Sequence, residues 1–372
     1  MVYLIRCNDI VSDPRAMKYI HYLRKQGHDF KLVGWDRDNK EEATPETLYY
    51  KKKAGHNVGG MKAAFNRIGW MRYVLRQLRQ IPKGKVFLHC CDLDAAFPAA
   101  IYKKFFNRDA FILFDVFDWF SASMSNQNLI IREAFLWMEK VSMKWTDHYL
   151  ICEPEREEQF PCKVDENKLS ILPNIPYFED DSFLRKDKGF TFSNSLPVFS
   201  YVGYFSNERC IDEIISLAGE GKINLLIAGY GSESIEQHLQ ELHNCANIKY
   251  FGKVKYADGL RIMYNSDIVY AMYSKVIPNH IYAAPNKYYE SMFLGKSIFT
   301  TQGTIVGDKV LKNGLGYVSE ESKDEILGAI NKIKHDEMGK KGEYAHKLWE
   351  STFSAYTENF MKTTYEQLIS LK

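Results

Sequence analysis

The residues best suited to chemistry lie in one short segment, residues 284–301. Pro285 favours the first turn of a helix, Gly295 favours its end, and an apolar run typical of a buried strand follows. Free amides at such a helix N-terminus, with the ammonium of Lys287 nearby, suit a diphosphate. The carboxylate of Glu290, one turn later, can accept two hydrogen bonds from a ribose diol. The alternative interpretation is a solvated ion pair between Lys287 and Glu290.

Short apolar runs recur through the first half of the chain and leave room for a helix between successive runs. This alternation is typical of an α/β domain with a parallel sheet. The first helix has Ser12 as its expected cap, Pro14 in its first turn and Gly27 at its end. We predict strands at residues 2–7, 30–35, 85–90, 110–117 and 148–152.

The alternation restarts after a polar, proline-flanked stretch at residues 173–197. Further strands are predicted at residues 198–205, 223–228, 248–252, 268–273 and 297–301. We therefore expect two doubly wound lobes that face one cleft, because ligands of such sheets bind beyond the carboxyl ends of the strands. The expected divisions are an N-terminal lobe at 1–172, a C-terminal lobe at 173–350 and a helix at 351–372 that packs back across the lobes.

Composition narrows the class of protein. The formal net charge of +2 over 372 residues gives no dominant basic field, so we expect no nucleic-acid partner. Seven scattered cysteines without C-x-x-C spacing indicate neither a disulfide framework nor a zinc site, and they fit a reducing cytoplasm. No apolar run is long enough to span a bilayer or to form the core of a signal peptide.

The segment Pro-Asn-Lys-x-x-Glu-x-Met-x-x-Gly-Lys, from Pro285, resembles the donor-site helix of family 4 glycosyltransferases. These are retaining enzymes with the GT-B fold of two Rossmann-like lobes, and they use nucleotide diphosphate sugars as donors. The resemblance covers nearly the whole chain and implies no cofactor and no metal. The other segments that resemble motifs of this family, in the same order, are residues 13–16, 27–35, 89–94, 114–118, 171–174, 201–205 and 225–231.

The resemblance implies roles for individual residues on the donor side. It assigns the nucleotide ribose to Glu290, and it assigns the diphosphate to the backbone amides of Asn286 and Lys287. Cations fixed there stabilise the charge that the leaving diphosphate gains, so Lys287 and Arg209 are the expected catalytic cations. The remaining implied contacts are Gly203 and Arg209 beside the same phosphates and Lys253 and Val254 beside the base.

The sequence departs from the family pattern at three positions. Tyr204 stands where many members have an arginine, and Tyr282 stands where many have a second glutamate. Phe117 occupies a position that usually holds a histidine, and we therefore expect Asp118 to contact the transferred sugar. These departures leave open a non-catalytic subunit that binds a nucleotide sugar.

Asp92-Leu-Asp94 matches a D-x-D pattern that binds divalent metals in a different glycosyltransferase fold. This tripeptide lies in the wrong lobe for that role, so we predict no metal site. We expect Asp92 and His89 to line the acceptor side of the cleft. The alternative for His89 is a buried, hydrogen-bonded histidine at a strand end.

Residues 48–91 contain no acidic residue, and they concentrate positive charge in the N-terminal lobe. Phe65, Ile68, Leu75 and Leu78 fall at helical spacing as a candidate apolar face. The candidate basic stripe on the same helix consists of Arg72, Arg76, Arg79 and Lys83. An anionic membrane would attract residues 51–85, whereas the alternative is a solvated helix that only covers the lobe.

We therefore predict a retaining, metal-independent hexosyltransferase. It would move a sugar from a nucleotide diphosphate sugar to a glycan or lipid-linked glycan acceptor in surface polysaccharide synthesis. We expect the protein in the cytoplasm, peripheral at the inner membrane face. The alternatives are a sugar-nucleotide 2-epimerase of the same fold and the non-catalytic binding subunit.

Overall fold

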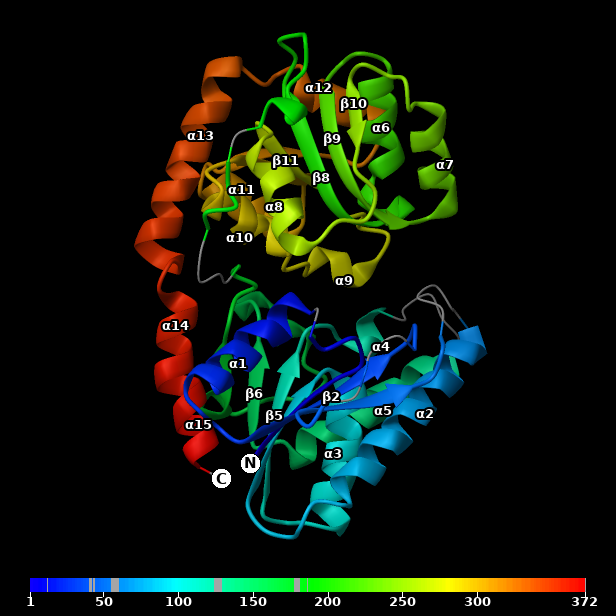
Figure 1. Ribbon diagram of the computed structural model, residues 1–372, viewed down its shortest axis with the longest axis vertical. Helices are drawn as coiled ribbons and strands as arrows, with labels where there is room; N and C mark the ends of the chain where they lie inside the picture. The colour runs from blue at the N-terminus through cyan, green and yellow to red at the C-terminus, as the bar shows by residue number, and fades with distance from the viewer. Residues whose placement is uncertain are drawn as a thin grey trace. The chain divides into compact units, whose positions relative to one another are not determined.

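The structure is a computed structural model, and it divides into two compact units. The first comprises Met1–Pro173 and Tyr356–Lys372, and the second comprises Asn174–Ala355 (Figure 1). The residues that it describes are 1–11, 13–39, 42, 44–54, 60–123, 129–176, 181–185 and 187–371, with the backbone alone at 60–64 and 123.

The first unit is built on a parallel sheet of seven strands in the order β3-β2-β1-β4-β5-β6-β7. The chain order reverses between β1 and β4, as in a doubly wound fold, so the strand ends near this point are where ligands bind. The strands are β1 (Val2–Arg6), β2 (Phe30–Asp36), β3 (Thr47–Lys51), β4 (Val86–Cys91), β5 (Ala110–Val116), β6 (His148–Ile151) and β7 (Leu169–Ile171).

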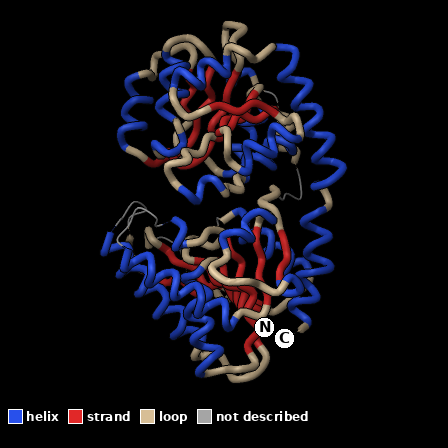
Figure 2. Tube along the Cα trace, turned by 180° about the vertical axis from the view of Figure 1, so that it is seen from behind, coloured by secondary structure: helices blue, strands red, loops and turns tan. Residues whose placement is uncertain are grey.

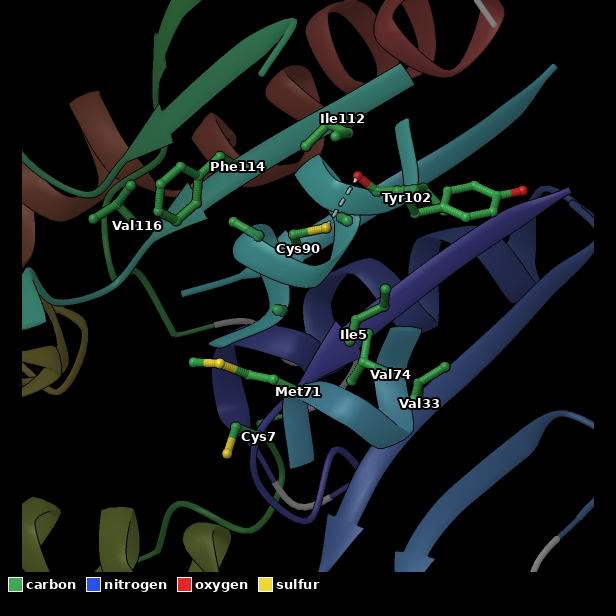
Figure 3. Close-up of a cluster of buried hydrophobic side chains, with 14 of the residues drawn as sticks. Ile5, Cys7, Val33, Met71, Val74, Cys90, Tyr102, Ile112, Phe114 and Val116 are labelled. Atoms are coloured by element: carbon green, nitrogen blue, oxygen red, sulfur yellow. Dashed lines mark hydrogen bonds between the residues drawn. The ribbon is translucent and has the colours of Figure 1, made fainter. Parts of the chain in front are cut away.

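One face of this sheet is covered by α2 (Gly60–Leu78), α3 (Leu93–Phe105) and α5 (Leu129–Trp145), with the short α4 (Phe120–Ser123) before α5 (Figures 1 and 2). Because side chains alternate along a strand, Ile5 points to this face whereas its neighbour Leu4 points to the other. Figure 3 shows the resulting core, in which Ile5, Val33 and Val74 meet.

The opposite face of the sheet carries α1 (Pro14–Lys25), α14 (Tyr356–Phe360) and α15 (Glu366–Ser370). The N-cap of α1 is Asp13, whose side chain accepts hydrogen bonds from the amides of Arg15 and Ala16. Ser12, the expected cap, lies outside the described residues. The C-terminal segment from Tyr356 onwards therefore belongs to the core of the first unit.

The second unit has a parallel sheet of six strands in the order β10-β9-β8-β11-β12-β13, again doubly wound, with the chain order reversing between β8 and β11. Its strands are β8 (Val198–Phe205), β9 (Asn224–Gly231), β10 (Ile248–Tyr250), β11 (Ile268–Ala271), β12 (Ser297–Thr301) and β13 (Gly316–Ser319). Its helices are α6 (Ile211–Gly219), α7 (Glu233–Glu241), α8 (Tyr256–Tyr264), α9 (Pro278–Ile281), α10 (Asn286–Phe293), α11 (Ile305–Lys312), α12 (Lys323–Ile330) and α13 (His335–Leu348).

Shorter helical turns complete the chain. The 3-10 turns are Pro154–Gln159, Glu166–Lys168, Lys188–Phe190 and Asn207–Arg209, and the π turns are Trp349–Phe353 and Met361–Tyr365. Among the helices that the structure describes, none has both the length and the apolar character that crossing a bilayer requires.

Candidate functional site

The candidate site of the second unit is centred on α10, which precedes the buried strand β12. Pro285 is the N-cap of this helix, and Gly295 follows its end with a φ of 64°, a backbone conformation that favours glycine. The helix predicted between these two residues is thus confirmed. Asn286 is exposed at its first position, and Lys287 and Glu290 follow within its first turns.

Glu290 is buried, with 4% of its surface exposed. Its Oε1 accepts a hydrogen bond of 2.7 Å from the hydroxyl of Tyr256, the first residue of α8. The two helices are labelled in Figure 1. A buried carboxylate is costly unless it is hydrogen-bonded, so this contact stabilises the charged form. The alternative of a solvent-exposed pair with Lys287 does not describe this side chain.

Lys287 reaches from α10 to the end of β8. Its Nζ lies 5.0 Å from the centroid of the Tyr201 ring and 3.1 Å from the place that a Cβ on Gly203 would take. Burial lowers the pKa of Lys287 to about 8, with Arg209 acting in the same direction and Glu290 opposing it. Gly203 has a φ of 155°, so its lack of a side chain serves both the backbone and the ammonium.

Arg209 comes from the 3-10 turn that follows β8. Its guanidinium carbon lies 4.2 Å from the centroid of the Tyr273 ring. Burial raises the pKa of Tyr273, and the charge of Arg209 lowers it while that of Glu290 raises it. Arg209 and Lys287 are thus two cations near the carboxylate of Glu290, and the carboxylate of Glu208 also interacts with Arg209. We call Arg209, Lys287 and Glu290 the polar cluster, and its two cations can bind an anionic ligand.

Two other predicted residues lie on the loop between β10 and α8. The Nζ of Lys253 lies 4.6 Å from the centroid of the Tyr230 ring, at the end of β9. The side chain of Val254 packs against an apolar cluster that contains Leu226 and Ala228. Tyr204 meets Tyr230 edge to face, with their ring centroids 5.8 Å apart.

Sequence reasoning missed the tyrosines around the polar cluster. Tyr273 ends a predicted strand, and Tyr201 lies inside another, so their positions in the sequence place both near the strand ends of this unit. Tyr256 has no such signal, because its contact with Glu290 joins positions 34 residues apart.

In the first unit, His89 is fully buried. Its Nδ1 lies 2.9 Å from the hydroxyl of Tyr365, in the C-terminal segment, and its Nε2 lies 3.3 Å from Oδ2 of Asp115. Asp115 also accepts hydrogen bonds from Arg15 and Tyr19. This is the buried, hydrogen-bonded histidine of the alternative interpretation, and the expected place of His89 on an acceptor surface is corrected accordingly.

Asp92, directly after β4, forms hydrogen bonds with residues at the ends of β1 and β5. Its Oδ1 accepts hydrogen bonds from the amides of Phe117 (2.9 Å) and Asp118 (3.2 Å), and its other oxygen binds Arg6. Burial raises the pKa of Asp92 to about 6, although Arg6 opposes the shift. The side chain of Asp118 is 58% exposed and pairs with Arg156 at 2.9 Å, which leaves Asp118 accessible.

The geometry of the acidic residues bears on metal binding. Asp94 pairs with Arg67 at 3.1 Å, whereas Asp92 pairs with Arg6, so the two carboxylates of the D-x-D tripeptide have separate cationic partners. His89, Cys91 and Asp115 bring ligand-type atoms within 4.8 Å of one another. All three are buried, and the carboxylate of this group is held by an arginine, so the group is part of the core.

The predicted basic stripe is exposed on and just after α2, but the apolar face of this helix differs from the expectation. Trp70, Val74 and Leu78 are buried, whereas Phe65 is 67% exposed and Ile68 is 45% exposed. The buried face follows the i, i+4 row that begins at Trp70. Two side chains of the candidate apolar face therefore lie on the surface together with the cations.

Comparisons with known proteins bear on the family and the fold of this chain. Residues 184–352 match the family model described as "Glycosyl transferases group 1". The chain is similar to the structure of sucrose-phosphate synthase (tll1590) from Thermosynechococcus elongatus, with a TM-score of 0.71, 15% identity, and coverage of 100% of this chain and 99% of that chain. No curated protein matches the sequence.

Two further solved structures have the same architecture. WaaG, a glycosyltransferase involved in lipopolysaccharide biosynthesis, has a TM-score of 0.65 at 12% identity, over 96% of this chain and 98% of that chain. Anabaena Alr3699/HepE, in complex with UDP and glucose, has a TM-score of 0.63 at 10% identity, over 98% of this chain and 99% of that chain. These likenesses confirm the predicted fold, two Rossmann-like units of the GT-B type.

Proposed function

We propose that the protein is a retaining glycosyltransferase, because residues 184–352 match the family model described as "Glycosyl transferases group 1". The proposed donor is a nucleotide diphosphate sugar that carries a hexose, and the proposed acceptor is a glycan or a lipid-linked glycan. The structure of HepE with UDP and glucose supports a donor of this class. The proposed setting is surface polysaccharide synthesis.

The observation that carries the proposal is the polar cluster of the second unit. Glu290 is a buried carboxylate held by Tyr256 through one oxygen, and such a group can accept hydrogen bonds from the ribose diol. Arg209 and Lys287 lie around it as two cations. A ribose joined to a diphosphate matches this pairing of one acceptor with two positive charges.

The same cations account for catalysis. When the glycosidic bond breaks, the leaving nucleotide diphosphate gains negative charge, and fixed cations stabilise the transition state more than the ground state. Lys287 and Arg209 supply this charge without a metal ion, and the amides of Asn286, Lys287 and Gly203 add hydrogen-bond donors. Asp118 contacts the transferred sugar in this proposal, since its side chain is 58% exposed.

The acceptor side of the proposal rests on the first unit. The exposed basic stripe and the exposed side chains of Phe65 and Ile68 combine positive charge with apolar surface. An anionic membrane attracts such a surface, with each well-placed cation contributing about 1 kcal/mol. We therefore propose a cytoplasmic protein, peripheral at the inner membrane face, whose acceptor is presented there.

A transfer assay tests this function. Purified protein is incubated with a panel of nucleotide diphosphate sugars, alone and with glycan or lipid-linked acceptors, and products are separated by chromatography. The proposal predicts nucleoside diphosphate release and an extended acceptor, with unchanged activity in EDTA. A new nucleotide sugar formed from donor alone would instead identify a 2-epimerase. Donor binding without turnover on any acceptor would indicate the non-catalytic subunit.

A further inference from the structure

An exposed aromatic pair and a lysine lie at the carboxyl ends of the second unit's strands. Tyr204 follows β8's Gly203 and is 41% exposed, and Tyr230, near the end of β9, is 38% exposed. Their rings meet edge to face at 5.8 Å, and the ammonium of Lys253 lies 4.6 Å from the centroid of the Tyr230 ring. The cation is therefore held over an aromatic surface that solvent reaches.

Neighbours in the sequence connect this group of side chains with the polar cluster. Gly203, directly before Tyr204, lies beside the ammonium of Lys287. Lys253 lies three residues before Tyr256, whose hydroxyl binds Glu290 at 2.7 Å. A ribose bound at Glu290 would thus place its attached base next to the loop that carries Lys253.

We propose that Lys253 selects the nucleobase of the donor. It would favour bases with a carbonyl oxygen at the edge farthest from the ribose, uracil and guanine, over cytosine and adenine. This inference rests on the proposed function, because it takes the ribose to be bound at Glu290.

Tyr230 and Lys253 would contribute to base binding in different ways. A tyrosine ring such as that of Tyr230 stacks on any base, because every base has a π-face, so stacking gives affinity without selectivity. A lysine ammonium has three donors and no acceptor. Uracil and guanine present a carbonyl oxygen at their far edge, whereas cytosine and adenine present an amino group that is itself a donor. The ammonium of Lys253 can therefore donate a hydrogen bond to uracil or guanine, whereas in cytosine or adenine it would meet another donor.

Lys253 differs from an ordinary surface lysine in its surroundings. Within the described part of the chain it forms no ion pair with a carboxylate, so its hydrogen-bond donors are not already committed to a counter-charge. Its contact with Tyr230 restricts the flexible stem and keeps the ammonium near the strand ends. Lys255, exposed two residues further on at the cap of α8, provides a matched control on the same loop.

Calorimetric titration with UDP, CDP, GDP and ADP tests the proposal on the full chain. Affinities are compared within two pairs, UDP with CDP and GDP with ADP, and the pair that binds more tightly is used. Within that pair the wild type should bind the nucleotide with the carbonyl-bearing base about tenfold or more tightly, which is the effect of one charge-assisted hydrogen bond. Lys253→Met should bring that ratio close to one, mainly through weaker binding of UDP or GDP. Lys255→Met should leave the ratio unchanged.

The outcomes separate this inference from the proposed function. Equal affinities of the wild type within both pairs, or a ratio that survives in Lys253→Met, would overturn the role of Lys253 while the donor site stands. A ratio lost equally in Lys255→Met would also overturn it, because a general loss of loop charge would then explain the effect. Failure of the wild type to bind any of the four nucleotides would overturn both proposals.

Discussion

Lys287 should make donor binding depend on pH in the alkaline range. Burial lowers the pKa of this lysine to about 8, so in the free protein its ammonium loses its proton within reach of ordinary buffers. A diphosphate binds the charged form, because the cation is part of the polar cluster. Binding should therefore weaken as the pH rises through the pKa of Lys287. Above this pH most of the free protein carries a neutral Lys287, which has to take up a proton when the diphosphate binds.

The size of the effect follows from the titration curve. If only the charged form binds, the competent fraction falls about tenfold between roughly pH 7 and pH 9, which equals about 1.4 kcal/mol in binding free energy. Calorimetry with UDP across this range measures it directly. The second ionisation of a phosphate group lies near pH 6, so the ligand contributes little change above neutral pH.

Two variants test whether Lys287 causes this loss of affinity at alkaline pH, which we call the step. Lys287→Arg keeps a charge at all these pH values and should give a flat profile. Lys18, in the first unit, also has a pKa lowered by burial, to about 7, and Lys18→Met should leave the step in place. A flat wild-type profile, or a step that persists in Lys287→Arg, would refute the reasoning.

Three further perturbations test other parts of the molecule. Tyr256→Phe removes the hydrogen bond to Glu290 and should weaken UDP binding by about 1 to 3 kcal/mol; unchanged affinity in calorimetry would show that the contact is unimportant. Asp115→Asn leaves the buried guanidinium of Arg15 without its counter-charge and should lower the stability of the first unit by about 3 kcal/mol, seen in urea unfolding. An unshifted urea midpoint would argue against that network. Reversing the basic stripe to glutamate should abolish co-sedimentation with anionic vesicles and spare transfer to a soluble acceptor, whereas wild-type protein that ignores such vesicles at low salt would exclude the membrane proposal.

The sequence was sufficient for the two-unit α/β architecture but not for the sheet edges. The central strands are continuous apolar runs, because both of their faces are covered. The edge strands β3, β7 and β13 were missed, since they are short and only partly buried, and their apolar signal is correspondingly weak. The phase of α2 was also wrong, because Phe65 and Ile68 have helical spacing but do not face the sheet.

The candidate site, like the fold, could be predicted only in part from the sequence. The helix of Lys287 and Glu290 could be predicted because a proline, a glycine and the two charges lie close together in the chain. The burial of His89 could not, because its partner Tyr365 lies 276 residues away, in the C-terminal segment. Tyr256 was likewise hidden, since only the folded chain brings α8 against α10. Contacts between residues so far apart in the sequence depend on packing that local sequence patterns do not encode.

The central claim is that Glu290 reads the ribose of a nucleotide donor, and a cycle of two changes tests it most directly. Calorimetry compares the nucleoside diphosphate that the wild type binds most tightly with its 2′,3′-dideoxy analogue, on the wild type and on Glu290→Ala. We predict that loss of the diol costs the wild type about 1 to 3 kcal/mol and costs the variant almost nothing, because the partner of the diol is already gone. An equal preference for the nucleotide with the intact diol in both proteins, or no such preference in the wild type, would contradict the account.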